Sequence, residues 1–474
     1  MKNLLYDKAS TLKLEETLKK KGISSLLLMT RAGFNIYQLI KNKIKYDQII
    51  VLAGPGSNGG DAIAFAIHAK INNENVSCLS LSNHKNNSKK LYNFSKQIGL
   101  EFKKYKKNLF VSKKKLLIIE GILGIGISRE PSGLISKIIS DLNTSSARSN
   151  KTVVSIDIPA GLNPDNGVAY ANTVIADYTI MCLTKKQGCY TGDGLKHSGK
   201  LYFTNLSVGN VEKIHSTKNI LLESEEREFL YRNKLGHKGN FGNVLILGGW
   251  DNMPGAANLA SQAALRSGCG KVFICTNNYD NLPDEIIRVE PNLNSIQKII
   301  GKINVIIAGP GLGNRANDIL KYFWKTKLPI IFDADALNWL SRNFKTKRKA
   351  LLIGTPHYGE AKSLLRKDFK DRFLAIKKIK EKYGGRWVLK GPGTLILNSK
   401  LYVNNFANSI LATAGSGDVL AGIIGGLVAQ NIKNPEIIAV KIQSFAAKKL
   451  LKQQNKTMLA SDLLEEISKS IYTN

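Results

Sequence analysis

The residues best suited to chemistry stand in a glycine-rich segment, ATAGSGDVLAG, at positions 412–422. We expect Gly415 to Asp418 to form the start of a helix that packs tightly through later glycines. Free N–H groups and the helix dipole at such a start can stabilise charge on a transferring phosphoryl group. Asp418 in that field can take the proton of an attacking hydroxyl. The alternative is a buried glycine-rich helix that Asp418 merely caps.

Four further polar turns in the second half each follow a short apolar run. They are GPGLG at 309–313, DADAL at 333–337, TPHYGE at 355–360 and KGPGT at 390–394. Parallel strands present such turns at one carboxyl edge of the sheet, where ligands bind. His357 and Glu360 are too few ligands for zinc. We interpret His357 as a group that hydrogen-bonds a substrate, with a satisfied turn histidine as the alternative.

A second set of glycine-rich turns occupies the first half. GPGSNGGD at 54–61 follows an apolar run and is predicted to open a helix over Asp61–Lys70. It fits a dinucleotide fingerprint, yet residues 79–83 lack the carboxylate that would hold a ribose. A plain tight turn is possible, as are side-chain oxygens of Asn58 and Asp61 facing a ligand or a monovalent ion.

Two more turns favour a single pocket in this half. EGILGIGISR at 120–129 and DIPAGL at 157–162 also follow predicted strands. Three such turns at three strand ends describe one pocket better than three unrelated loops. The nearest approach to a phosphate-binding Walker A motif, residues 194–201, lacks the hydroxyl that would hold magnesium, and we discard it.

The elements that position these turns are short β-branched runs alternating with helical stretches, which is typical of parallel α/β layers. At roughly 100–200 residues per domain, 474 residues predict two or three domains. A polar stretch near residues 210–240 breaks the rhythm. We therefore predict an α/β protein with a Rossmann-like three-layer α/β/α domain over 1–213, a linker over 214–230 and a second α/β domain over 231–474.

The composition excludes some classes of protein but does not by itself indicate a function. The 69 basic and 36 acidic residues give a net charge of +33, mostly from scattered lysines without a dense basic arm. We expect no nucleic-acid partner from charge alone. The five cysteines form no disulfide-like or metal-like spacing, the N-terminus lacks a signal-peptide core, and the apolar run 409–430 holds Asp418 and five glycines. We expect a cytoplasmic protein without a membrane span.

The first-half turns resemble those of the NAD(P)H-hydrate epimerases. The resemblance implies that Asn58, Glu120 and Ala160 surround a potassium ion. It departs from the family at Ser57, Glu120 and Ala160, where Asn, Asp and Ser are usual, and Ala160 could offer the ion only its carbonyl. The residues implied to contact the hydrated nucleotide are Ser57, Asn58, Gly59, Gly60, Asp61, Gly124, Ile125, Gly126, Ile127, Ser128, Arg129, Glu130 and Asp157.

The second-half motifs resemble the ribokinase-like kinases, and as a set the ADP-dependent (S)-NAD(P)H-hydrate dehydratases. The likeness spans roughly residues 231–472 and implies a ribokinase-like fold. Ala256, Gly313, His357 and Asp418 would line the hydrate site. The adenylate of the phosphoryl donor ADP would bind Lys390, Gly391, Pro392, Gly393, Thr394 and Gly417. Mg²⁺ is expected between the phosphates.

Together the halves are similar to the bifunctional NAD(P)H-hydrate repair enzymes. The resemblance implies that the first half interconverts R and S hydrates, with Asp157 as candidate proton carrier. The second half would phosphorylate the S hydrate through Asp418 and release AMP and phosphate. The expected partners are small nucleotides and further copies of this chain.

Three alternatives stay open. The chain could be an ATP-dependent ribokinase-like kinase of a small molecule, fused to a nucleotide-binding domain. Its first half could be an RNA-protein scaffolding module, which the positive charge would help. That half could also have lost activity, given Ser57, Glu120 and Ala160.

Overall fold

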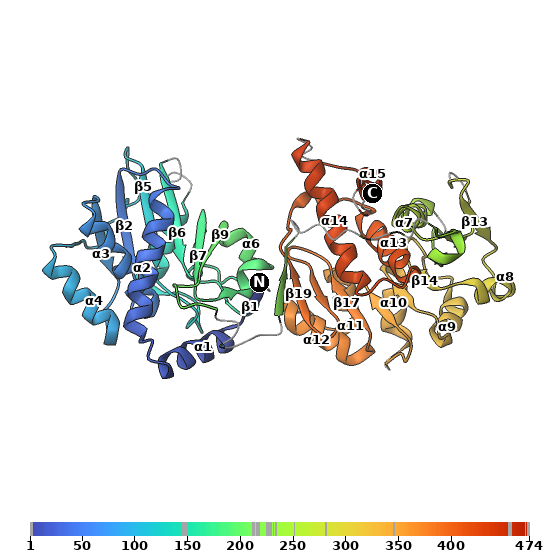
Figure 1. Cartoon of the computed structure of the whole chain (residues 1–474), viewed down its shortest axis with the longest axis horizontal. Helices are drawn as coiled ribbons and strands as arrows, with labels where there is room; N and C mark the ends of the chain where they lie inside the picture. The colour runs from blue at the N-terminus through green and yellow to red at the C-terminus, as the bar shows by residue number, and fades with distance from the viewer. Residues whose placement is uncertain are drawn as a thin grey trace. The chain divides into compact units, whose positions relative to one another are not determined.

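The protein is described by a computed structural model that divides into two compact units, Met1–Ile220 and Leu221–Asn474 (Figure 1). Most of the predicted linker 214–230 lies outside the described residues. The structure describes residues 3–144, 150–210, 214, 219–223, 230, 232, 235–250, 252–279, 282–344, 347–453, 457–469 and 471. Within these residues no helix is both long and apolar enough to cross a membrane.

The first unit is built on a seven-stranded parallel sheet in the order β4-β3-β2-β5-β6-β7-β9. Its strands are β2 Gln48–Ala53, β3 Val76–Ser80, β4 Glu101–Phe102, β5 Leu116–Gly121, β6 Lys151–Ile156, β7 Tyr178–Cys182 and β9 Lys200–Thr204. Its helices are α1 Lys8–Lys20, α2 Ser25–Lys41, α3 Ser57–Ile71, α4 Asn86–Gln97, α5 Gly133–Asn143 and α6 Gly194–His197. A separate pairing joins β1 Leu4–Tyr6 to β8 Lys185–Lys186 and to the first residues of β10 Asn219–Leu222.

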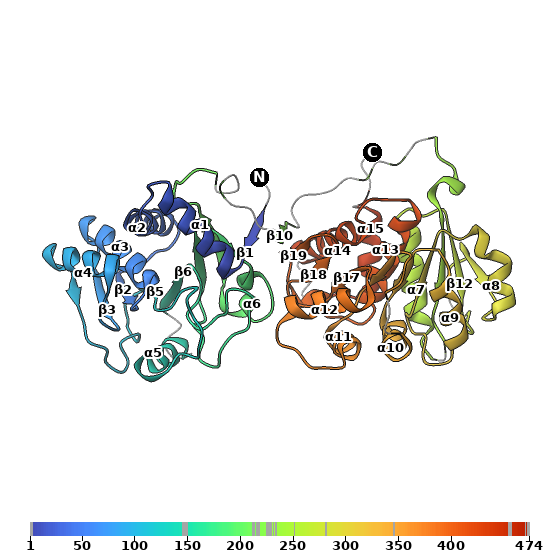
Figure 2. The same ribbon diagram turned by 90° about the horizontal axis from the view of Figure 1, so that it is seen from below.

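Alternating side chains of this sheet feed two hydrophobic cores. Ile49 and Val51 of β2 pack with α1, α2 and α3 on one face, whereas Ile50 and Leu52 pack with α5 on the other. Figure 2 shows α2 and α3 on one side of the sheet and α5 on the opposite side. The predicted three-layer α/β/α architecture is therefore confirmed.

Strand order fixes where this unit can bind a ligand. The chain runs from β2 outward to β3 and β4, then returns so that β5 lies on the other side of β2. The connections after β2 and β5 leave the sheet in opposite directions, which opens a crevice at their carboxyl ends. The turns at 54–61 and 120–129 follow these two strands.

One predicted boundary in this unit was wrong. The helix expected over Asp61–Lys70 begins at Ser57, and its first turn contains two adjacent glycines that resemble loop residues. The apolar run 174–181 forms a strand only from Tyr178 onward. The residues before it bond elsewhere: the Val174 N–H donates to the Ala160 carbonyl at 2.9 Å, and the Asp177 carboxylate accepts from the Val153 N–H at 2.8 Å.

The second unit contains a sheet in the order β13-β12-β11-β14-β15-β16-β17-β18-β19, parallel up to β17 and antiparallel beyond it. Its strands are β11 Asn243–Leu247, β12 Lys271–Cys275, β13 Ile286–Val289, β14 Val305–Ala308, β15 Ile330–Phe332, β16 Leu352–Gly354, β17 Arg386–Leu389, β18 Leu395–Leu397 and β19 Leu401–Asn404. Its helices are α7 Pro254–Arg266, α8 Leu293–Ile299, α9 Asn317–Lys325, α10 Ala334–Asn343, α11 Tyr358–Leu365, α12 Arg372–Tyr383, α13 Ser416–Ala429, α14 Pro435–Lys452 and α15 Ala460–Ser468.

Helices cover both faces of this sheet. Figure 2 shows α13 and α14 on one side and α9, α10 and α11 on the other. The order of strands reverses between β11 and β14, so this unit also has a switch point, at the ends of those two strands. All five cysteines are buried free thiols.

Glycines allow α13 to lie against its neighbours. A Cβ added at Gly422 would stand 2.3 Å from the Ala260 carbonyl oxygen of α7. One at Gly425 would stand 2.3 Å from Ile307 Cδ1, and one at Gly426 only 1.9 Å from Ser267 Oγ. The tight packing predicted for this helix is thus present, and it fixes the position of the helix start that carries Asp418.

Gly422→Ala should therefore lower the free energy of unfolding of the second unit by about 1–3 kcal/mol, the usual cost of overpacking. All four tryptophans lie in this unit, so their fluorescence in denaturant measures its unfolding. Gly255→Ala on α7 is the matched control, because nothing lies within 4 Å of its added Cβ. Equal stability of the two variants would contradict this account of the packing.

Candidate active sites

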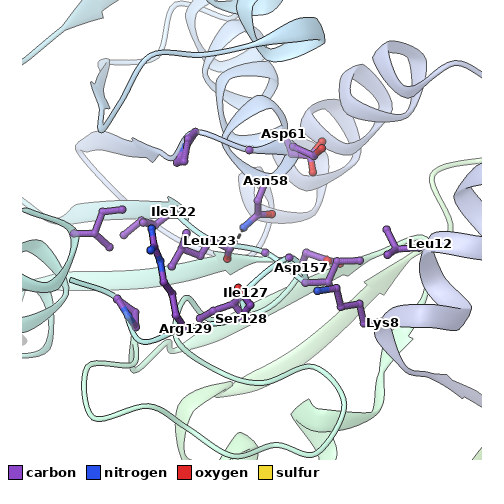
Figure 3. A pocket seen from close by; sticks show the side chains of 18 of the residues that line it. Lys8, Leu12, Asn58, Asp61, Ile122, Leu123, Ile127, Ser128, Arg129 and Asp157 are labelled. Carbon is purple, nitrogen blue, oxygen red and sulfur yellow. Dashed lines mark hydrogen bonds between the residues drawn. The ribbon is translucent and has the colours of Figure 1, made fainter. Parts of the chain in front are cut away.

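The first site is a cavity of about 520 Å³ at the switch point of the N-terminal sheet (Figure 3). The turns after β2, β5 and β6 form its walls, together with α1. Sequence reasoning had missed the contribution of α1. The lining residues are Lys8, Leu12, Glu15, Pro55, Gly56, Ser57, Asn58, Asp61, Ile122, Leu123, Gly124, Ile125, Gly126, Ile127, Ser128, Arg129, Glu130, Pro131, Ser132, Ile135 and Asp157.

The structure brings together most of the residues expected to contact the hydrate. Ser57, Asn58 and Asp61 reach the cavity from the first turn of α3, and all seven residues of 124–130 line it. Gly59 and Gly60 do not line the cavity. A Cβ at Gly59 would stand 1.9 Å from the Gly54 carbonyl oxygen, so this glycine lets α3 approach the turn before it.

The residues predicted around potassium lie together at the end of β5. Glu120 is fully buried, and its carboxylate accepts the Ile122 N–H at 3.0 Å, the Ser155 hydroxyl at 2.7 Å and the Ala160 N–H at 3.4 Å. Burial raises its pKa to about 7, although these hydrogen bonds act in the opposite direction. The Asn58 amide donates to the Leu123 carbonyl at 3.1 Å, as the dashed line in Figure 3 shows.

Asp157 stands at the carboxyl end of β6 in a left-handed conformation, with φ of +67°. Its Oδ1 accepts the Cys182 N–H at 3.0 Å and the ammonium of Lys186. Lys186 is 1% exposed and also donates to the Cys182 carbonyl at 2.7 Å. This lysine belongs to none of the sequence motifs, so the sequence did not identify it.

Asp61 faces the same cavity with a raised pKa. Burial is the main cause, and the negative charges of Asp157 and Glu15 add to it, while Lys186 acts weakly in the opposite direction. The charge of Asp157 therefore acts on Asp61, while Lys186 forms its ion pair with Asp157.

The second site gathers around the start of α13. Gly415 caps the helix with φ of +86°, as only glycine does without strain, and Asp418 lies in the first turn. A Cβ at Gly417 would stand 3.0 Å from Lys390 Nζ and 3.6 Å from Asp333 Oδ2. The predicted nucleotide turn at 390–394 and the predicted phosphoryl site therefore meet.

A carboxylate cluster surrounds Lys390. Its ammonium donates to Asp333 Oδ1 at 2.7 Å and lies 3.9 Å from Glu360 Oε2. Burial raises the pKa of Asp418 to about 7, helped by the charge of Asp333 and opposed by Lys390. Within the described part of the chain, no three His, Cys, Asp or Glu side chains are arranged to hold a metal ion.

His357 has a structural task in addition to the predicted one. Its Nδ1 accepts the Gly359 N–H at 2.9 Å and so caps α11, while the Glu360 carboxylate accepts the His357 backbone N–H at 2.7 Å. The imidazole is 60% exposed, with Nε2 at 3.3 Å from Glu360 Oε1. The ring can thus meet a substrate while it holds the turn.

Ala256 and Gly313 lie at the switch point of the second sheet. The loops after β11 and β14 are joined by bonds from the Gly249 N–H to the Pro310 carbonyl at 2.9 Å and from the Trp250 N–H to the Gly311 carbonyl at 2.7 Å. The Gly313 N–H donates to Asp335 at 2.9 Å. These contacts place the two residues expected on the hydrate side at one sheet edge.

Arg372 holds the nucleotide turn and was missed at the sequence level, since it lies outside the motif. Its guanidinium donates to the carbonyls of Leu389 at 3.1 Å, Lys390 at 3.2 Å and Gly393 at 3.1 Å, and to that of Pro392. Burial lowers its pKa to about 10. A single planar side chain therefore fixes the path of the loop.

An α/β domain with a switch point and a glycine-rich helix start that carries a carboxylate is typical of proteins that bind nucleotides or phosphate groups. Residues 244–469 match the NAD(P)H-hydrate dehydratase family, and residues 25–188 match the YjeF-related protein N-terminus. A ribokinase-like superfamily protein from Enterococcus faecalis is 25% identical, with a TM-score of 0.50 over 54% of this chain and 96% of that one.

Relatives that span both halves narrow the class to one family. The bifunctional NAD(P)H-hydrate repair enzyme of Coxiella burnetii is 32% identical over 98% of both chains. That of Escherichia coli is 30% identical over 87% of this chain and 82% of its own. The chain belongs to the bifunctional NAD(P)H-hydrate repair enzymes, which join an epimerase half to a dehydratase half.

Arg372→Lys should raise the nucleotide KM of the dehydratase about tenfold, because one ammonium cannot replace a fork that donates to four carbonyls. That factor corresponds to about 1.4 kcal/mol of binding free energy, close to the net contribution of one hydrogen bond. Steady-state kinetics with varied ADP measures it. Arg342→Lys on α10 is the control, since that exposed guanidinium bonds only to Asn314 among the described residues. An unchanged KM in Arg372→Lys would refute the assignment.

Proposed function

We propose that this chain restores NADH and NADPH from their hydrates, with ADP as phosphoryl donor in its C-terminal half. The observation that carries the proposal is the meeting of Asp418, Gly417 and Lys390 at the start of α13. A base, the backbone N–H groups at a helix start and a cation then surround one point, as phosphoryl transfer to a hydroxyl requires.

The dehydration proceeds through a phosphate ester. Asp418 takes the proton of the hydrate hydroxyl, and that oxygen attacks the terminal phosphorus of ADP, from which AMP departs. The start of α13 stabilises the negative charge on the transferring group. The ring nitrogen lone pair then expels phosphate, and loss of a ring proton restores the dihydronicotinamide. Hydroxide leaves poorly at neutral pH, and the ester removes this difficulty.

Nucleotide binding involves the turn at 390–394 together with Gly417. Ala256, Gly313 and His357 bind the hydrate beside them. Mg²⁺ typically binds through one or two carboxylates and substrate phosphates, so it needs no cage of protein ligands here. When bound, it neutralises phosphate charge.

The N-terminal half interconverts R and S hydrates, so that both forms reach the dehydratase. The hydrated carbon is bonded to the ring nitrogen, and loss and re-addition of water is an accessible route. Asp157 carries the proton. Asn58, Glu120 and Ala160 would hold K⁺ through oxygen atoms, because oxygen ligands suit such a cation and these three residues carry a side-chain amide, a buried carboxylate and a backbone carbonyl. The ion would offset the buried charge of Glu120 and order the loops around it.

One assay separates the two enzymatic candidates. Incubation with hydrated NADH and ADP or ATP should restore the absorbance of the dihydronicotinamide, whereas a kinase of another small molecule would leave it unchanged. Supplying R hydrate freed of the S form tests the epimerase half, which must act faster than spontaneous conversion. Salt-sensitive RNA binding that does not change with hydrates would instead favour the scaffolding alternative.

We also propose that the protein is cytoplasmic and forms an oligomer of identical chains.

Asp418→Asn should lower the dehydration kcat by about 10²–10⁴-fold, the usual share of a general base, with the ADP KM nearly unchanged. The base acts when ionised and its pKa in the free protein is about 7, so wild-type kcat/KM for the hydrate should rise with pH through about 7 and then level off. The variant should lose that dependence. Wild-type kcat in Asp418→Asn would end the proposed mechanism.

K⁺ should stabilise the N-terminal half more at pH 8 than at pH 6. The Glu120 pKa is about 7, and protons therefore compete with the cation below that value. Calorimetric unfolding in KCl and in choline chloride measures the difference, without reference to activity. Glu120→Gln should abolish the pH dependence of the effect. Equal transitions in both salts at pH 8 would exclude the ion.

A further inference from the structure

Asp61 and Asp157 line the N-terminal cavity, and the buried Lys186 is paired with Asp157. The proposed function assigns no role to these three groups acting together. Asp157 accepts two hydrogen bonds at Oδ1, from Lys186 and from the Cys182 N–H. Within the described residues, no hydrogen bond occupies its Oδ2. Asp157 lines the cavity and is 14% exposed on its side chain, so one oxygen remains for a ligand.

Among the side chains that the structure describes, Lys186 hydrogen-bonds that of Asp157. At 1% exposure its ammonium cannot reach solvent, and its two hydrogen bonds go to Asp157 and to the Cys182 carbonyl. A buried ammonium next to a carboxylate favours the ionised form of that carboxylate. The lysine does not line the cavity, and its direct contact with the groups that do is made through Asp157.

Asp61 lies on the same side of the cavity without such a partner. Figure 3 shows Asp61 on α3 and Asp157 after β6, both toward the side where Leu12 and Lys8 of α1 lie. The titratable groups around this pair are Lys186, Glu15 and Cys182, and the cavity is also lined by Lys8, Arg129 and Glu130. The pKa of Asp61 is raised by burial and by the charges of Asp157 and Glu15. Within the described residues, one of these two carboxyl groups is thus paired with an ammonium and the other is not.

We propose that Lys186 is a positioning residue that holds Asp157 as a carboxylate facing the pocket, so that Asp61 donates and Asp157 accepts the protons of epimerisation. Asp61 protonates the hydroxyl of the hydrate, the ring nitrogen lone pair forms the C=N bond, and water leaves. Water then adds to the other face of the iminium and gives its proton to Asp157. One proton moves from Asp61 to Asp157, and it returns through solvent or in the next turnover with the roles reversed.

This inference rests on the proposed epimerase function, and the test keeps the two apart. Lys186→Met removes the ammonium and keeps the length of the side chain. The acid limb of the epimerase profile of kcat/KM against pH should move up by at least about one unit, with about a tenfold lower rate at pH values below the limb and full recovery above it. The neighbouring Lys185→Met is the control, because Lys185 donates to Asn3 Oδ1 at 2.7 Å and takes no part in the pocket.

Dehydratase activity on S hydrate, measured in the same samples, shows whether the second half is folded and active. If Lys186→Met does not fold in its N-terminal half, as circular dichroism would show, Asp61→Asn decides. It should lower the epimerase kcat about 10²-fold or more, keep the KM, and remove the alkaline limb of the profile. Lys186→Arg should retain the wild-type acid limb.

Each adverse result has one meaning. A wild-type chain that does not epimerise at any pH overturns the proposed function of this half. An active wild type whose acid limb is unmoved in folded Lys186→Met overturns the role of Lys186. An alkaline limb that persists in Asp61→Asn overturns the role of Asp61.

Discussion

A lysine ammonium held against an aspartate in a mostly buried place organises each site of this chain. Lys186 pairs with Asp157 in the first half, and Lys390 pairs with Asp333 in the second. Removing a charge from water is costly unless an opposite charge and hydrogen bonds compensate it. Each lysine hydrogen-bonds one carboxylate, Asp157 or Asp333, whereas burial raises the pKa of a second carboxyl group nearby, Asp61 or Asp418. In the proposed mechanisms, the protonation state of each carboxyl group depends on whether it is paired with the lysine.

Close backbone packing puts those groups within reach of one another. A Cβ at Gly54 would stand 1.8 Å from the Ile122 carbonyl oxygen, and one at Gly248 would stand 2.1 Å from that of Pro310. In both units the glycines therefore draw together the two loops that flank a reversal of strand order. Larger residues at these positions would separate the loops and open the pocket. The glycine-rich motifs are as much packing devices as they are ligand contacts.

The sequence predicts a large part of this arrangement because its signals are local. The strands, the helix start at Gly415 and the clustering of turns at one sheet edge follow from β-branched runs and glycine spacing. Lys186 and Arg372 could not be found in this way, since neither residue belongs to a motif and their partners are distant or are backbone carbonyls. The early start of α3 was missed because Gly59 and Gly60 favour a loop until tertiary packing holds them in a helix.

In the proposed mechanisms the same desolvation serves an acid in one half and a base in the other, and the position of the lysine would account for the difference. Lys390 lies next to Gly417 and lowers the pKa of Asp418 against the effect of burial, which leaves that pKa at about 7, so a large fraction is ionised near neutrality. Lys186 spends its charge on Asp157 and affects Asp61 least among the groups around it. Burial therefore raises the pKa of Asp61 with little opposition, whereas Lys390 opposes this effect at Asp418. In the proposed mechanisms, dehydration needs a base for the hydroxyl and epimerisation needs an acid for the departing one, and the positions of the two lysines favour these roles.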